Sequence, residues 1–125
     1  MQQSDVAAMV SLAGSTAVVT GGGGGIGGGT SRLFAAAGAT VVVNDIDAEL
    51  AGAAVADIEA GGGTAVAVVG DIREVPTVEE LHTVATKVAG GAIDVLVNNV
   101  GDYRPNGLFA ETDEDQWAAQ YEIQL

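Results

Sequence analysis

The run of five glycines Gly21–Gly25 most constrains this sequence, because it stands directly after the short apolar segment Ala17–Val19. That segment is typical of a buried parallel strand, and residues 25–37 have helical apolar spacing from Ile26 to Leu33. A glycine turn between strand and helix lets a ligand phosphate approach the backbone, and the helix N-terminus supplies free N–H groups. The glycines are also compatible with a flexible loop, but their placement favours a phosphate-binding turn, Thr20 to Gly27.

Alternating strand and helix patterns continue along the chain. β-branched runs predict three more strands, at residues 40–43, 65–69 and 93–97. Amphipathic segments predict three more helices, at residues 47–60, 77–89 and 112–125. This alternation predicts an α/β fold with right-handed crossovers, a Rossmann-type doubly wound parallel sheet of four strands in the order 3-2-1-4. We expect residues 1–15 to form a leader and residues 16–125 to form one domain.

Local end signals support these boundaries. Asp47 is a candidate N-cap, and Gly38 follows the first helix as a C-terminal glycine would. The sequence Thr77–Glu80 resembles a capping box and predicts a helix that starts at Thr77. The last predicted strand, residues 93–97, would have an unpaired apolar edge that invites self-association or pairing with a complementary C-terminal half.

The charge balance excludes several classes of partner. The 125 residues contain 4 Lys+Arg against 17 Asp+Glu, a formal net charge of −13, which argues against nucleic acid and anionic membrane surfaces. Any bound phosphate must therefore be held mainly by backbone N–H groups. Cysteine is absent, and neither a signal peptide nor an apolar run long enough to span a membrane is recognisable, so we expect a cytoplasmic protein.

Asp45 follows the second predicted strand at about the distance from the glycine turn where a dinucleotide-binding domain carries its ribose ligand. A carboxylate there accepts hydrogen bonds from ribose hydroxyls and repels the additional phosphate of NADP. Asp45 could instead be a turn residue or an N-cap. Because Asp47 already suits the cap, we expect Asp45 to bind ribose and the cofactor to be NAD, with NADP less favoured.

Four segments in register resemble the short-chain dehydrogenase/reductase family. Thr20-Gly-x-x-x-Gly25-Ile26-Gly27 resembles its cofactor motif, and Asp71-Ile72 resembles its adenine-side pair. Asn98-Asn99-Val100-Gly101 resembles its Asn-Asn-Ala-Gly motif, with valine in place of alanine. Residues 117–125 resemble the start of the next helix, so the resemblance covers the chain beyond the leader.

The resemblance implies a nicotinamide-dependent oxidoreductase that transfers hydride between the cofactor and an alcohol or carbonyl. Asn98 and its neighbours would then hold the central sheet and line the adenosine and ribose, although two asparagines could also simply cap a strand end. The cofactor-binding residues expected from the motifs are Thr20, Gly21, Gly25, Ile26, Gly27, Asp45, Asp71, Ile72, Asn98, Val100 and Gly101.

The sequence departs from the family at its catalytic residues. The family uses a serine and a Tyr-x-x-x-Lys pair, but here Tyr103 is followed four residues later by Gly107 and Tyr121 by Leu125. The family's relay asparagine would fall near Gln124. The chain has about half the length usual in the family, so we assign no catalytic residue to it.

Three hypotheses therefore compete. The chain is the NAD-binding part of an oxidoreductase whose second half lies elsewhere, a non-enzymatic nucleotide-binding or interaction module, or a remnant without function. No metal site is expected, since His82 stands alone on a predicted helix. We interpret Arg32, Arg73 and Arg104 as surface charges rather than substrate-binding groups.

Overall fold

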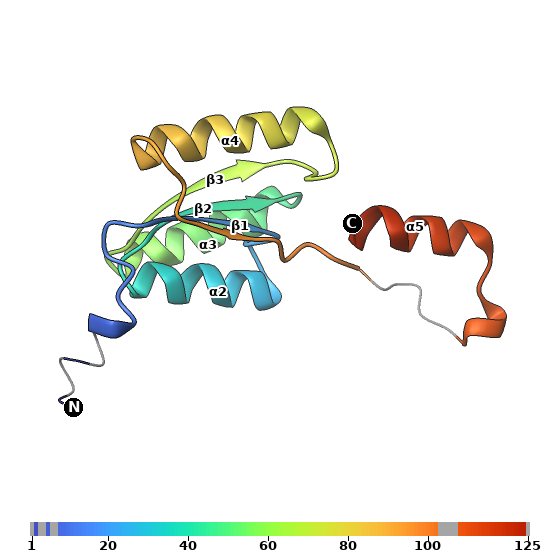
Figure 1. The fold of residues 1–125 in the computed structure, drawn as a ribbon, viewed down its shortest axis with the longest axis horizontal. Helices are drawn as coiled ribbons and strands as arrows, with labels where there is room; N and C mark the ends of the chain where they lie inside the picture. Colours follow the sequence, from blue (N-terminus) through green and yellow to red (C-terminus); the bar gives the residue numbers. More distant parts are fainter. Residues whose placement is uncertain (1, 3–4, 6–7, 103–107, 125) are drawn as a thin grey trace.

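The computed structural model describes residues 2, 5, 8–102 and 108–124 (Figure 1). The predicted parallel sheet and its strand order, β3-β2-β1-β4, are confirmed. Helices α2 and α3 cover one face of the sheet and α4 the other, while α5 lies beyond the carboxyl ends of the strands (Figure 1). The elements are β1 (Thr16–Thr20), α2 (Gly25–Ala36), β2 (Thr40–Asp45), α3 (Ala48–Ala60), β3 (Thr64–Val69), α4 (Val75–Ala89), β4 (Val95–Val97), the 3₁₀ helix η1 (Phe109–Glu111) and α5 (Glu114–Gln124).

The central strand β1 divides its side chains between two cores. Ala17 and Val19 belong to the cluster under α2 and α3, whereas Val18 belongs to the cluster under α4. This alternation follows from the two-residue period of a strand. Because both faces are covered, all five residues of β1 are buried.

The buried face of α2 differs from the one expected from the apolar spacing. Ile26 and Leu33 are 84% and 68% exposed, whereas the side buried against the sheet consists of small residues. Small side chains are favoured on the face of α2 that contacts the sheet, because they let the helix axis approach the strands closely. The buried residues are Gly27, Gly28, Ser31 and Ala35.

The predicted starts of α4 and β4 are wrong. Helix α4 begins at Val75, with Glu74 as N-cap and Pro76 in the first turn, so Thr77 is not a capping residue. Proline suits a first turn, where its missing N–H is not needed. Strand β4 begins at Val95 instead of residue 93, and Ile93 packs against the core under α4.

Other boundaries agree with the sequence. Asp47 caps α3, accepting hydrogen bonds from the amides of Glu49 and Leu50. Gly38, which follows the C-cap residue Ala37 of α2, has a φ of +102°. Tyr103, Arg104, Gly107 and Leu125 lie outside the described residues. Within the described part of the chain, no helix combines the length and apolarity that crossing a bilayer requires.

Candidate functional site

A cavity of about 570 Å³ opens at the carboxyl ends of the strands, next to the glycine turn. Its walls come from the β1–α2 turn, the ends of β2 and β3, the segment after β4 and Ile123 of α5. The structure therefore brings together residues that are far apart in the sequence. The predicted site residues that line it are Gly21, Gly25, Asp45, Asp71, Ile72, Val100 and Gly101.

The other predicted site residues lie around this cavity without lining it. Thr20 and Gly27 are buried beneath the turn, and Ile26 projects from the first turn of α2. Thr20 and Asn98 line a neighbouring cavity of about 540 Å³, which also reaches α5. Thr20 and Gly27 thus shape the turn from below.

Close packing determines the shape of the glycine turn. Gly21 has a φ of +61°, and a methyl group there would lie 2.8 Å from Asn99 Nδ2. A methyl group on Gly27 would overlap the carbonyl oxygen of Gly21. Asn99 secures this arrangement by donating from Nδ2 to the carbonyl oxygens of Thr20, at 3.0 Å, and Gly21, at 3.3 Å. The turn is packed on both sides, which the flexible-loop alternative did not anticipate.

The two helix N-termini near the cavity differ in how they are capped. Helix α3 has the side chain of Asp47 as its cap and Glu49 in its first turn. Helix α2 has Gly24 as its N-cap, with no side-chain hydrogen bond and no acidic residue in its first turn. Gly24 and Gly25 line the cavity, so this uncapped end offers its N–H groups and partial positive charge to an anion there.

Asp45 lies at the end of β2 and holds the turn on that side. Its Oδ2 accepts a hydrogen bond of 3.0 Å from the amide of Gly23, and its Oδ1 accepts one of 3.0 Å from the amide of Asp47. The turn role considered for Asp45 is therefore real. Each carboxylate oxygen can accept more than one hydrogen bond, so the side chain also retains acceptor capacity toward the cavity.

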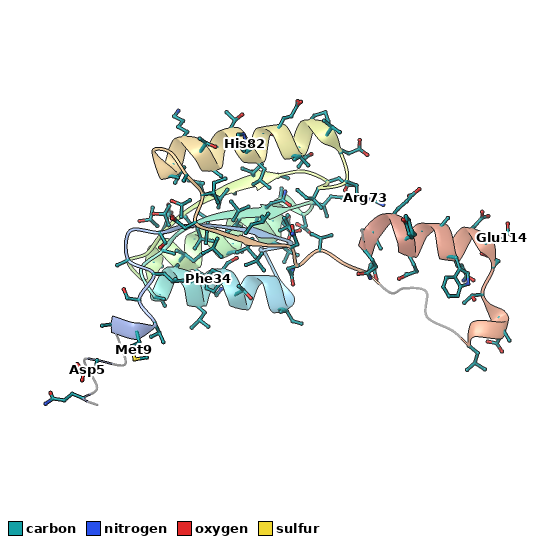
Figure 2. The ribbon with its side chains drawn as sticks, viewed as in Figure 1. Asp5, Met9, Phe34, Arg73, His82 and Glu114 are labelled. Carbon is teal, nitrogen blue, oxygen red and sulfur yellow. The ribbon has the colours of Figure 1, made fainter. Side chains whose placement is uncertain are left out.

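Asp71 follows β3 and forms an ion pair with Arg73. The distance from Asp71 Oδ2 to Arg73 Nη2 is 2.7 Å, and the side chains are 22% and 45% exposed. Hydrogen bonds from the side chain and backbone of Arg73 lower the pKa of the Asp71 carboxyl group below its ordinary value. Arg73 is on the surface as expected, but it also lines the cavity, on the side of the sheet that faces α5 (Figure 2).

The sequence did not reveal the contacts made by two asparagines of the site. Asn99 was part of a recognised motif, yet its amide bonds to the turn depend on strands β1 and β4 being neighbours. Asn44, which is 1% exposed, donates from Nδ2 to the carbonyl oxygens of Val68 and Gly70 and so joins the ends of β2 and β3. A polar residue at the end of a β-branched run was the available signal for Asn44.

A protein-family model described as short chain dehydrogenase matches residues 15–125. The chain belongs to the short-chain dehydrogenase family. The strand order β3-β2-β1-β4 agrees with that membership. Among the described residues, no three His, Asp or Glu side chains are grouped so that they could hold a metal ion.

Individual members of this family match along nearly the whole chain. The chain is 42% identical to the hydroxyacyl-CoA dehydrogenase ChsB1 of Mycobacterium tuberculosis, covering 91% of this chain and 37% of that protein. A 7α-hydroxysteroid dehydrogenase solved with NADH and 7-oxo glycochenodeoxycholic acid has 35% identity and a TM-score of 0.85, over 100% of this chain and 47% of the other. A metagenomic short-chain oxidoreductase solved with NADP has 32% identity and a TM-score of 0.79, over 91% and 51%.

These matches also show how much of each relative's length the chain covers. It spans from about a third to about half of the length of these short-chain dehydrogenases. Both forms of the nicotinamide cofactor occur among the solved structures.

Proposed function

We propose that this chain binds a nicotinamide dinucleotide, NAD in preference to NADP, as the cofactor-binding half of an oxidoreductase. The whole protein would transfer hydride between the nicotinamide and an alcohol or carbonyl group. The observation that carries the proposal is the cavity that joins the uncapped N-terminus of α2 to the carboxylate of Asp45. A cytoplasmic location and a leader that ends at residue 15 belong to the same proposal.

The parts of the cavity suit the parts of the ligand. The diphosphate would lie at the first turn of α2, where Gly21, Gly25, Ile26 and Gly27 present backbone without large inward side chains, over the buried Thr20. The adenine would lie toward Asp71 and Ile72, and its ribose would lie against Asp45. The segment after β4, with Asn98, Val100 and Gly101, would border the ribose.

The preference for NAD follows from charge. Asp45 would accept hydrogen bonds from the hydroxyls of the adenosine ribose, but it would repel the 2′-phosphate of NADP. Arg73 is the one cationic side chain among the described residues that line the cavity, and its ion pair with Asp71 offsets its charge. The described residues of the site therefore offer no uncompensated cation for a third phosphate.

Calorimetric titration of the 125-residue chain with NAD and with NADP tests this function. We expect NAD to bind more tightly, and Asp45→Ala to weaken NAD about 10–100-fold, the effect of losing a charged hydrogen-bond partner, while NADP changes less. Asp47→Ala is the matched control, because it removes a neighbouring carboxylate that caps α3 without lining the cavity. Equal losses for both cofactors, or no binding by the wild type, would refute the proposal.

The edge of β4 supports a second candidate function, an interaction module. Leu96 is 59% exposed there, beside an apolar cavity of about 440 Å³ that includes Val78 and Leu81 of α4. We propose that a complementary C-terminal half of a short-chain dehydrogenase covers this edge. A second copy fits less well, because two chains of formal charge −13 repel each other.

Sedimentation analysis of the chain alone distinguishes these occupants. A monomer at low and moderate salt is expected if the occupant is the complementary half. A stable dimer that Leu96→Lys abolishes would instead identify a second copy as the occupant.

A further inference from the structure

In the loop after β3, the carboxylate of Asp71 accepts hydrogen bonds from both the backbone and the side chain of Arg73. Asp71 Oδ1 accepts hydrogen bonds from the backbone amide of Arg73, at 2.9 Å, and from its Nε, at 3.0 Å. Asp71 Oδ2 accepts from Arg73 Nη2 at 2.7 Å and shares Nε at 3.1 Å. The guanidinium of Arg73 thus binds the Asp71 carboxylate in a bidentate manner, which fixes the position and the plane of the carboxylate.

Arg73 uses only part of the hydrogen-bonding capacity of the Asp71 carboxylate. A carboxylate has about four acceptor positions, and three N–H groups of Arg73 make four contacts to it because the Nε–H group is shared by both oxygens. The contact from Nε to Oδ2, at 3.1 Å, is the longest of the four, so Oδ2 keeps the most acceptor capacity for a ligand. Asp71 lines the cavity and its side chain is 22% exposed, so this acceptor is open to a ligand donor.

We propose that Arg73 determines which base the site accepts, by holding Asp71 as an oriented group that only accepts hydrogen bonds. This inference rests on the proposed dinucleotide function. A purine with an exocyclic amine donates to such a carboxylate, whereas a purine with an oxo group at the same position presents a second acceptor against it. A site built to receive an N–H group discriminates strongly against an analogue that lacks one.

The surroundings of Arg73 favour this orienting role over a phosphate-binding role. Its charge faces Asp71 directly, and Glu74 and Glu122 add negative charge around it. Arg73 also lines the neighbouring cavity together with Glu122 and Gln124 of α5, so carboxylates lie near it on more than one side. The lowered pKa of Asp71, caused mainly by the hydrogen bonds from the Arg73 side chain, agrees with an acceptor that stays ionised.

The test compares NAD with its hypoxanthine analogue, which carries an oxo group in place of the adenine amine. Calorimetry on the wild-type chain should give at least about tenfold tighter binding of NAD, about the value of one good hydrogen bond. In Arg73→Ala, the freed Asp71 can rotate and become protonated more easily, so the preference should fall to about threefold or less.

Arg32→Ala is the matched control for this test. Arg32 forms an ion pair of 2.8 Å with Asp57, its side chain is 41% exposed, and it does not line the proposed cofactor cavity. This variant should keep the full preference for NAD. A full preference in Arg73→Ala, or none in the wild type, would overturn the role of Arg73. Failure of the wild type to bind either dinucleotide would instead refute the proposed function itself.

Discussion

Thr20 and Asn99, 79 residues apart in the sequence, hold each other through reciprocal hydrogen bonds. The hydroxyl oxygen of Thr20 accepts from the backbone amide of Asn99 at 3.0 Å, and Asn99 Nδ2 donates to the backbone oxygen of Thr20 at 3.0 Å. The same hydroxyl donates to the carbonyl oxygen of Val97. The last residue of β1 thereby ties the glycine turn to the segment after β4, and this tie sets one wall of the cavity.

Replacing Thr20 with valine should destabilise the domain. Valine keeps the volume of threonine but removes an oxygen that accepts hydrogen bonds from the amides of Asn99 and Val100. Leaving these part-buried amides without their partner should lower the free energy of unfolding by about 1–3 kcal/mol. Urea denaturation measures the change. Thr20→Ser retains the hydroxyl and should recover most of the loss; equal stability of Thr20→Val and wild type would contradict the role of the hydroxyl.

Two glycines of α2 should respond to alanine in opposite ways. A methyl group on Gly29 would meet no atom within 4 Å, so Gly29→Ala should stabilise the chain by about 1 kcal/mol through better helix propensity. A methyl group on Gly27 would overlap the Gly21 carbonyl and lie 2.5 Å from Asn99 Nδ2. Gly27→Ala should therefore destabilise by about 1–3 kcal/mol, the usual range for overpacking. Thermal unfolding of both variants checks the contrast, and a shared direction would refute it.

The ion pair of Asp71 and Arg73 should make stability depend on pH in the acid range. The pKa of Asp71 is lowered in the folded chain, so the pair stabilises the fold above the ordinary carboxyl pKa and loses this contribution as pH falls through the lowered value. A carboxyl-carbon NMR titration should find Asp71 below the usual aspartate range. In Arg73→Ala its pKa should rise toward the ordinary value, and an unchanged midpoint would show that Arg73 is not the cause.

The sequence was sufficient for the order of elements and the place of the turn, because both depend on local signals. β-branched runs, the Asp47 cap and the glycines at element ends act within a few residues. The same reasoning failed for the inner face of α2. Apolarity favoured Ile26 and Leu33, but the distance between helix and sheet favoured glycine, serine and alanine there.

The candidate site was predictable only in outline. Its motif residues were recognisable one segment at a time, and most of them do line one cavity. Arg73 was interpreted as an ordinary surface charge because nothing in the sequence shows that it forms an ion pair with Asp71 in the wall of that cavity. Asn44 was missed because its burial depends on β3 lying beside β2.

The sequence alone determined that strands and helices alternate, that a glycine turn opens the first helix, and that acidic charge prevails, because composition and short-range periodicity carry this information. The tertiary structure decided which side chains meet across the carboxyl ends of the strands: Thr20 with Asn99, and Asp45 with the glycine turn. These contacts join residues far apart in the chain. They exist only once parallel pairing has brought the ends of the strands together at one edge.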